Sequence, residues 1–189
     1  TLGTMAALGL SRPHMPYKGL IMAILISPMI VPLIITAAGM FFFYARVNLV
    51  YTFTGVILAH VALATPFVVI TVTATLVGFD MNMVKASQSL GAKPMRTFFK
   101  VIMPLILPGI ISGALFAFIT SFDEVVIVMF MASLDQLTIP KQMWAGIRQE
   151  ISPVILCMAT CLVALSIFLL TTVELLRRRS EKLRGIKAR

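Results

Sequence analysis

Residues 47–79 read VNLVYTFTGVILAHVALATPFVVITVTATLVGF, which is 33 positions without an acidic residue, a lysine or an arginine. A helix needs about 20 apolar residues to cross the hydrocarbon core of a bilayer, because each residue adds about 1.5 Å of length. An apolar helix buried inside a soluble protein seldom exceeds about 14 residues. The stretch therefore predicts a membrane-spanning helix.

Three other uncharged runs are long enough to span: residues 19–45, 104–122 and 151–173, with 27, 19 and 23 positions. Residues 1–10 are also apolar, but they are too short to cross alone and lack the basic start and cleavage site of a signal peptide. We interpret them as the end of a further span. The predicted fold is an all-α, polytopic transmembrane helical bundle in one domain, residues 1–189.

The composition excludes a soluble globular domain. Of the 189 residues, 59% are apolar and 12% are charged, and the mean hydropathy is +1.00. Soluble domains average about 45–50% apolar and about 25% charged residues. A chain of this size exposes too much of its own surface to bury that excess.

Positive charge gathers at the ends of the predicted spans. The 16 Lys and Arg residues give a net charge of +9. Thirteen of them fall on one predicted side: Arg12, Lys18, Lys85, Lys93, Arg96, Lys100, Arg177, Arg178, Arg179, Lys182, Arg184, Lys187 and Arg189. Arg46, Lys141 and Arg148 fall on the other. Short cytoplasmic loops are enriched in Lys and Arg, so we predict that the 80–103 loop and the basic tail, residues 177–189, are cytoplasmic. The tail then faces anionic membrane lipid, and no nucleic acid is needed to explain the charge.

Glycine and proline indicate how the spans pack. Gly109, Gly113 and Ala117 recur every four residues, so they share one helix face and let another helix approach closely, as in ordinary bundle packing. Prolines within or at the start of spans remove a backbone donor and can kink a helix. These prolines are Pro28, Pro32, Pro66, Pro104 and Pro108.

The loop from Asp80 to Met103 is the most informative connection. The segment from Met81 to Leu90 predicts a short helix ending at Gly91, because glycine tolerates the left-handed conformation that closes a helix. Pro94 suits the first turn of a second short helix. Two short helices at an angle form a stiff projection that can transmit force to a partner. The alternative is a solvated basic loop.

The loop resembles the cytoplasmic signature of binding-protein-dependent ABC importer permeases. That signature is Glu-Ala-Ala, three residues, Gly, nine residues, then Ile, any residue, Leu-Pro. Ala86, Gly91 and Pro104 match it at the same spacing, Lys85 replaces the Glu, and Ser87 replaces the second Ala. The resemblance implies that Lys85, Ala86, Ser87, Gly91 and Pro104 belong to an ATPase-coupling loop, in which Gly91 sets the bend and Pro104 is the joint to the span.

Residues 121–126, 138–140, 142–144 and 151–153 are similar to the spermidine/putrescine branch of these permeases. The resemblance implies a six-helix type I importer subunit in a bacterial inner membrane, of which this chain lacks the first helix and most of the second. It also implies three partners: ATPase subunits, a second permease and a periplasmic or extracellular solute-binding protein. ATP and magnesium would bind the ATPase, and no cofactor is expected in this chain.

Asp123 and Glu124 lie about 28 Å along a helix counted from Pro104, near the outer end of the span. Ionisable residues at membrane depth are costly and often functional, and carboxylates bind ammonium groups through charge-assisted hydrogen bonds. The pair is therefore a candidate for a cation pathway or an outer gate. A helix-end pair that meets water or a neighbouring helix explains the same residues equally well.

Other polar and aromatic residues have weaker signals. His60 is a candidate proton relay, but a histidine hydrogen-bonded inside a bundle is the simpler interpretation. Cys157 and Cys161 are interpreted as small core residues rather than metal ligands. Trp144, on a predicted interfacial helix from Pro140 to Arg148, suits the membrane interface and is a candidate contact for a binding protein.

The chain has no phosphate-binding loop, no paired metal ligands and no nucleophile with a base. We therefore predict a non-enzymatic permease subunit that moves a small cation, such as a polyamine, by alternating access. The alternative is a secondary transporter or channel in which His60, Asp123 and Glu124 bind ions or protons.

Overall fold

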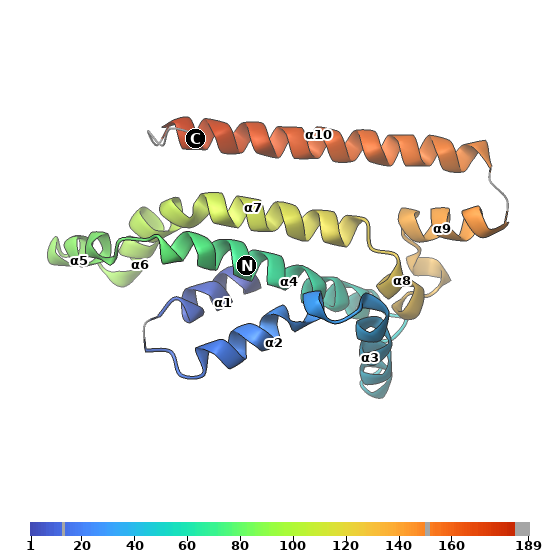
Figure 1. Cartoon of the computed structure of the whole chain (residues 1–189), viewed down its shortest axis with the longest axis horizontal. Coiled ribbons are helices and arrows are strands. Elements are labelled where there is room, and N and C mark those ends of the chain that lie inside the picture. Colours follow the sequence, from blue (N-terminus) through green and yellow to red (C-terminus); the bar gives the residue numbers. More distant parts are fainter. Residues whose placement is uncertain (13, 150–151, 184–189) are drawn as a thin grey trace.

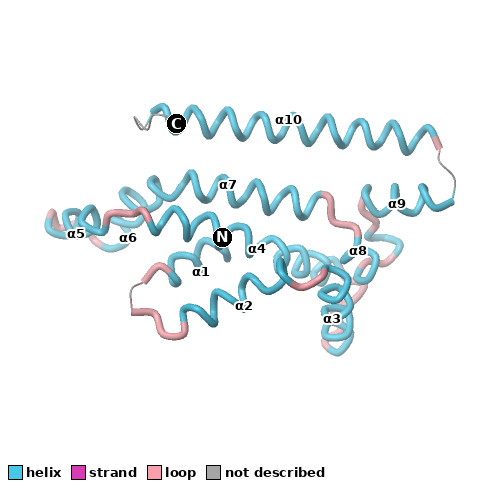
Figure 2. Tube along the Cα trace, viewed as in Figure 1, coloured by secondary structure: helices cyan, strands magenta, loops and turns pink. Residues whose placement is uncertain are grey.

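The computed structural model describes residues 1–12, 14–149 and 152–183. In these ranges every element of regular secondary structure is a helix (Figures 1 and 2). The α-helices are α1 Leu2–Leu10, α2 Lys18–Ile30, α3 Leu33–Arg46, α4 Phe53–Val77, α5 Met81–Ser89, α6 Pro94–Thr97, α7 Met103–Phe122, α8 Val126–Met131, α9 Ile139–Gln149 and α10 Pro153–Leu183. The all-α prediction is confirmed.

Helix α4 is the centre of the bundle and packs against α1, α2, α7 and α8. Towards its start, Ala59 and Leu63 join an apolar cluster with side chains of α3 and α8. Towards its end, Val72 packs with Ala7 of α1 and Ile106 of α7, and all three are fully buried. The two clusters fix α4 to different neighbours at its two ends.

The contact between α4 and α7 is made through glycine. A Cβ on Gly109 would meet the Thr71 carbonyl oxygen at 3.0 Å, and a Cβ on Gly113 would meet Val68 Cα at 2.9 Å. Real Cβ atoms hardly ever come this close to main-chain atoms, so only glycine fits here. The predicted close approach through these small residues is confirmed.

The first predicted span, residues 19–45, does not form one helix. It divides into α2 and α3, which meet at an angle of 108°. The cause is Pro32, which lacks a backbone donor and pushes the preceding Val31 into an extended conformation with ψ 136°. Helix α2 alone rises about 20 Å, which is shorter than the roughly 30 Å hydrocarbon core.

The longest predicted run also begins differently from expectation. Residues 47–52 form a turn in which Asn48 and Tyr51 have φ angles of 55° and 60°. Helix α4 begins at Phe53, and the Thr52 hydroxyl accepts a hydrogen bond from the Gly55 amide at 3.0 Å. The Tyr51 amide donates to the Met131 carbonyl at 2.9 Å, which fastens this turn to α8.

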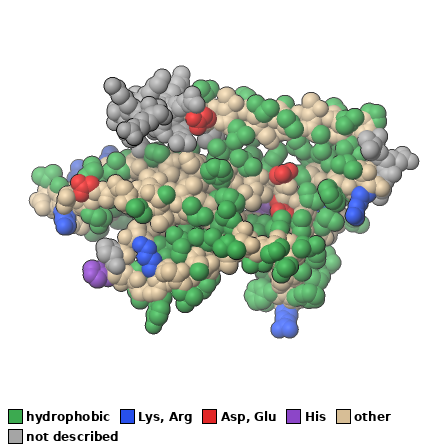
Figure 3. Space-filling view, in the orientation of Figure 1, with side chains coloured by type: hydrophobic (Ala, Val, Ile, Leu, Met, Phe, Trp, Pro, Cys, Tyr) green, Lys and Arg blue, Asp and Glu red, His purple; other side chains and the backbone are tan. Residues whose placement is uncertain are grey.

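Three helical segments are long and apolar enough to cross a membrane, and α2 with α3 would make a fourth span. The three are α4, the continuous helix Pro94–Phe122 and Pro153–Thr172 within α10. Hydrophobic side chains cover much of the face in Figure 3, and Lys and Arg lie towards its ends and edges. The chain is a multi-pass membrane protein.

The apolar window of α10 has no part buried inside the chain. Cys157 and Cys161 lie in this helix and are both exposed. The interpretation of these cysteines as core residues is therefore wrong for the chain by itself, because no other part of the chain covers their side chains.

The two ends of the bundle carry different segments (Figure 1). At one end, the α5 end, lie α5, the connection between α1 and α2 and the C-terminal end of α10. At the other, the α8 end, lie α3, α8 and α9. The 80–103 loop and the C-terminal end of α10 therefore share one end of the bundle, as the charge distribution predicted. Residues 184–189 of the basic tail lie outside the described residues.

Candidate functional site

Helix α5 is a short helix with both ends fixed by local contacts. At its start, Asp80 Oδ1 accepts a hydrogen bond from the Asn82 amide at 2.9 Å. At its end, the Gly91 amide donates to the Gln88 carbonyl at 2.9 Å, and Gly91 has φ 78°. The predicted helix end is confirmed, because glycine adopts this left-handed conformation without strain.

Ser87 joins α5 to α6. Its Oγ lies 2.9 Å from Oγ1 of Thr97, a side chain that is only 2% exposed. This pair gives a physical role to Ser87, which stands where the permease signature has alanine. Thr97 was not singled out in the sequence, because nothing in the local pattern shows that its hydroxyl has a partner ten residues away.

Apolar side chains of the 80–103 loop are exposed rather than buried. Met83 is 47% exposed, Met95 68% and Leu90 88%. A hollow of about 550 Å³ between the arms of the loop is lined by Met83, Ala86, Ser87, Leu90, Gly91, Ala92, Arg96 and Val101. Lys85 is exposed beside it. An apolar patch rimmed by polar and basic residues is typical of a protein docking surface.

The sequence predicted a separate short helix beginning at Pro94. Instead, α6 is the first part of one continuous helix from Pro94 to Phe122. Residues Phe98–Ile102 form a π-helical turn between α6 and α7. A proline ring clashes with the carbonyl four residues earlier in an α-helix, and the wider π-turn just before Pro104 accommodates it. Pro104 therefore lies within this continuous helix, directly after the π-turn, and its role as a joint stays a prediction.

Asp123 and Glu124 have different surroundings at the α8 end. Glu124 is 6% exposed, and its Oε1 accepts a hydrogen bond from the Ile127 amide at 2.7 Å. It therefore caps the start of α8, where a carboxylate is favoured by the helix dipole. Asp123 is exposed. Two adjacent carboxylates are thus divided between a structural contact and an open surface.

Lys141 holds the other end of α8. Its Nζ donates to the carbonyl oxygens of Val128 at 3.2 Å and Ala132 at 3.4 Å. Burial lowers the pKa of this ammonium group from its usual value. The sequence predicted on which side of the membrane Lys141 lies, but not its contacts with α8. These contacts are to backbone carbonyl oxygens, which no residue pattern reveals.

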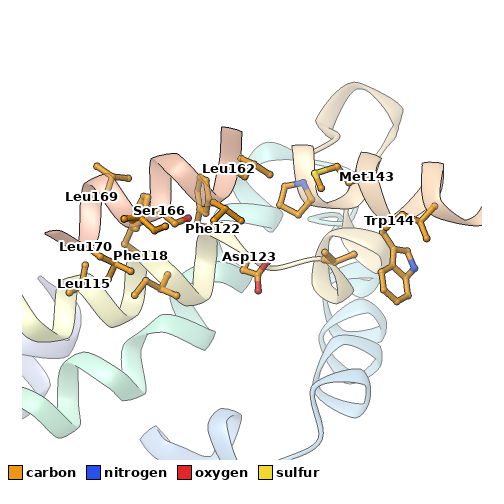
Figure 4. Close-up of a pocket in the computed structure, with 16 residues that line it drawn as sticks. Leu115, Phe118, Phe122, Asp123, Met143, Trp144, Leu162, Ser166, Leu169 and Leu170 are labelled. Atoms are coloured by element: carbon orange, nitrogen blue, oxygen red, sulfur yellow. The ribbon is translucent and has the colours of Figure 1, made fainter. Parts of the chain in front are cut away.

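A cavity of about 450 Å³ separates α7, α9 and α10 (Figure 4). Leucine and phenylalanine side chains from α7 and α10 lie at one end in this view, Met143 and Trp144 of α9 lie at the other, and Asp123 lies between them. Trp144 is 48% exposed. The helix predicted from Pro140 to Arg148 is present as α9, and Asp123 and Trp144 both line this cavity.

A second cavity of about 540 Å³ lies between α4, α7 and the start of α9. His60 and Ser121 both line it, and His60 Nδ1 lies 2.9 Å from Ser121 Oγ. The interpretation of His60 as hydrogen-bonded inside a bundle is confirmed. Within the described parts of the chain, no group of three His, Cys, Asp or Glu residues is placed to hold a metal ion.

Residues 1–182 match the family described as "Binding-protein-dependent transport system inner membrane component". The chain belongs to this family. It is a type I permease component of a binding-protein-dependent transport system, and it is similar to polyamine permeases. The match covers all the described helices except the last residue of α10.

The relatives to which this permease is similar include proteins named as polyamine permeases. The spermidine/putrescine transport system permease protein PotC of Haemophilus influenzae is 29% identical over 179 residues, which is 95% of this chain and 70% of that protein. PotC of Escherichia coli K12 is 28% identical over 181 residues, 96% of this chain and 69% of that protein. The putrescine transport system permease protein PotI of the same organism is 36% identical over 103 residues, 54% of this chain and 37% of that protein.

The cap on α8 gives a prediction for this permease. Glu124→Ala leaves the buried Ile127 amide without its acceptor, which costs about 1–3 kcal/mol. Glu124→Gln keeps an acceptor oxygen. We expect a lower unfolding temperature for the alanine variant and a smaller change for glutamine, measured on purified protein in detergent. Asp135→Ala, at an exposed acidic residue near the same end, is the control. Equal unfolding temperatures for Glu124→Ala and the control would contradict the cap.

Proposed function

We propose that this chain is the permease subunit of an ATP-driven importer for a small cationic solute of the polyamine class. The observation that carries the proposal is that the exposed helix α5 lies at one end of the helix Pro94–Phe122 and Asp123 lies at the other. One continuous helix thus connects a docking surface with the candidate pathway. The polyamine names of the relatives support the solute class.

ATPase coupling is the proposed role of the 80–103 loop. Lys85 and Ala86 are exposed on α5, and Leu90 is exposed directly after it. Gly91 and the Ser87–Thr97 pair fix the direction in which α5 projects. A short stiff helix in a cleft of an ATPase subunit can transmit rigid-body motion to the membrane helices. ATP and magnesium bind that separate subunit, and no cofactor is assigned to this chain.

The solute enters from the α8 end in this proposal. Asp123, exposed and lining the cavity beside α9, offers a carboxylate to a passing ammonium group. Trp144 on α9 contacts the solute-binding protein that delivers the cation. A second permease completes the pathway, which opens alternately to the two sides. The α5 end is cytoplasmic and the α8 end faces outward, because the short loops rich in Lys and Arg belong to the α5 end.

The test is uptake of radiolabelled spermidine and putrescine into proteoliposomes that contain the complete transporter with its ATPase and binding protein. We expect uptake only with ATP inside the α5-facing compartment and with the binding protein on the opposite side. Polyamine uptake driven by an ion gradient without ATP would instead support the secondary transporter. A complete, ATP-hydrolysing transporter that carries no polyamine would overturn the solute class.

The same assay tests Asp123. Asp123→Asn keeps the shape of the side chain and removes its charge, so we expect uptake to fall about tenfold, because hydrogen bonds between charged groups are the stronger ones. The ATPase rate stimulated by the loaded binding protein should stay within twofold, as a check on assembly. Unchanged uptake in a fully assembled transporter would remove Asp123 from the pathway.

Cross-linking tests the coupling loop. In a background with Cys157→Ser and Cys161→Ser, Ala86→Cys is expected to cross-link to the ATPase subunit, because Ala86 is exposed on α5. Gly39→Cys, exposed on α3 at the α8 end, is the matched control and should give no product. No cross-link from Ala86 in an assembled, active complex would contradict the docking role.

A further inference from the structure

The cavity between α4, α7 and α9 has a lining of unusual chemistry. Its polar side chains are His60, Ser121 and Thr138, and none of its lining residues is a lysine or an arginine. Both hydroxyls and a neutral imidazole offer lone pairs as acceptors. The rest of the lining is apolar or aromatic. The cavity therefore matches a ligand that has hydrogen-bond donors and an apolar chain.

The hydrogen bond to Ser121 decides what the histidine offers. His60 Nδ1 lies 2.9 Å from Ser121 Oγ. When Nδ1 carries the proton and donates to that oxygen, Nε2 keeps its lone pair and becomes an acceptor. In this tautomer Ser121 Oγ is the acceptor for Nδ1–H, and the second ring nitrogen is free to accept a hydrogen bond from a ligand.

Aromatic rings line the same cavity. Glu124, although buried nearby in sequence, is not among the residues that line it. Phe118 and Phe122, which both line the cavity, are stacked with ring centres 5.3 Å apart. The faces of aromatic rings attract cations. Imidazole, hydroxyl and aromatic groups of the lining therefore all favour the same kind of ligand.

The two cavities at the α8 end are neighbours. They share Phe118, Phe122, Pro140 and Leu162 in their linings, and Asp123 lines the first of them. A cation that leaves Asp123 thus meets the second cavity across a shared aromatic wall. Its volume of about 540 Å³ lies within the roughly 300–1,000 Å³ of small-molecule sites.

We propose that this cavity binds a primary ammonium group and part of the alkyl chain of the solute, with His60 Nε2 as the accepting atom and Ser121 as the residue that orients it. The ammonium has three donors and no acceptor, and the lining provides acceptors without a competing cation. The methylene chain lies along Val56, Ile57 and Leu162. The inference rests on the proposed function and adds the site at which the cation is held inside the permease.

Two isosteric variants separate ligand binding from packing. In His60→Asn the amide takes the position of Nδ1, so the bond to Ser121 is kept and Nε2 is lost. In His60→Gln the amide reaches the position of Nε2. We expect spermidine uptake at saturating loaded binding protein to fall about tenfold in His60→Asn, because a hydrogen bond to a charged group is lost. His60→Gln should stay within about threefold of wild type, and the stimulated ATPase rate should be unchanged in both.

A spectroscopic measurement tests the accepting atom directly. The chain contains two histidines, so His14→Gln leaves His60 as the single one in this subunit. With histidine labelled by nitrogen-15 only in this subunit of the assembled transporter, spermidine is expected to shift the Nε2 resonance more than the Nδ1 resonance. Sodium chloride at matched ionic strength is the control and should shift neither.

Three results overturn the site. They are wild-type uptake in His60→Asn, loss of ATPase stimulation together with uptake in that variant, and an Nε2 resonance that spermidine does not move. The first two would mean that His60 only packs or supports Ser121. Failure of the proposed function looks different: the wild-type transporter then carries no polyamine at all, whereas failure of the site leaves wild-type polyamine uptake intact.

Discussion

Replacing Gly113 with valine is expected to prevent this permease from folding into a stable bundle. A Cβ at this position would meet Val68 Cα at 2.9 Å and the Thr71 hydroxyl. The first is a main-chain atom of α4, so no side-chain rotation relieves the contact. Adding one methyl group to a tight core costs about 1–3 kcal/mol, and valine adds two more carbon atoms. We expect Gly113→Ala to lower the unfolding temperature and Gly113→Val to give no monodisperse protein on size-exclusion chromatography in detergent.

Gly39 provides the matched control for this prediction. It also lies within a helix, α3, but a Cβ there would meet nothing within 4 Å. Alanine is about 1 kcal/mol more favourable than glycine inside a helix, so Gly39→Ala should be neutral or stabilising. Gly39→Val should still give a monodisperse protein. Similar behaviour of the two valine variants would contradict the close contact between α4 and α7.

We expect Gly91 to affect the coupling between the ATPase subunit and the permease through its backbone angle φ, and not through its small size. Its φ is 78°, and a Cβ there would meet nothing within 4 Å. The left-handed conformation costs most L-residues about 1–2 kcal/mol, while asparagine tolerates it better. We therefore expect ATP-driven uptake to fall in the order Gly, Asn, Ala, Val, with a loss of about tenfold or more for valine.

The order of these variants is the test, because asparagine is larger than alanine. Uptake and ATPase stimulation should fall together, since the change reorients α5 at the ATPase, and the unfolding temperature of the membrane bundle should stay close to wild type. A ranking by side-chain volume, with alanine above asparagine, would contradict the argument from φ.

The sequence was sufficient for the fold class and for the segments whose structure depends on local chemistry. Residues 104–122 form α7 almost to the residue, because a long apolar run has no alternative to a helix in a membrane. The α5 helix ends beside Gly91 as predicted, because a left-handed residue is a local requirement. Residues 19–45 form two helices rather than one: the sequence indicated a possible kink at Pro32, but hydropathy does not reveal that the chain bends by 108° there.

The candidate sites were only partly predictable. Asp123 and Glu124 were recognised as a pair, but their separation into an exposed and a capping carboxylate depends on the Ile127 amide and on burial. Lys141 and Thr97 have partners that are distant in sequence or belong to the backbone. No local spacing encodes such contacts. The functional roles of the residues in both sites remain predictions for the experiments above.

The continuous helix Pro94–Phe122 has a mechanical consequence. Its 29 residues span about 43 Å at about 1.5 Å per residue, and α5 is joined to its start through Gly91. A rigid rotation of this length by about 10° would carry the far end through about 7.5 Å. In the proposed coupling, a small rotation at the α5 end would therefore become a displacement of several ångströms at Asp123.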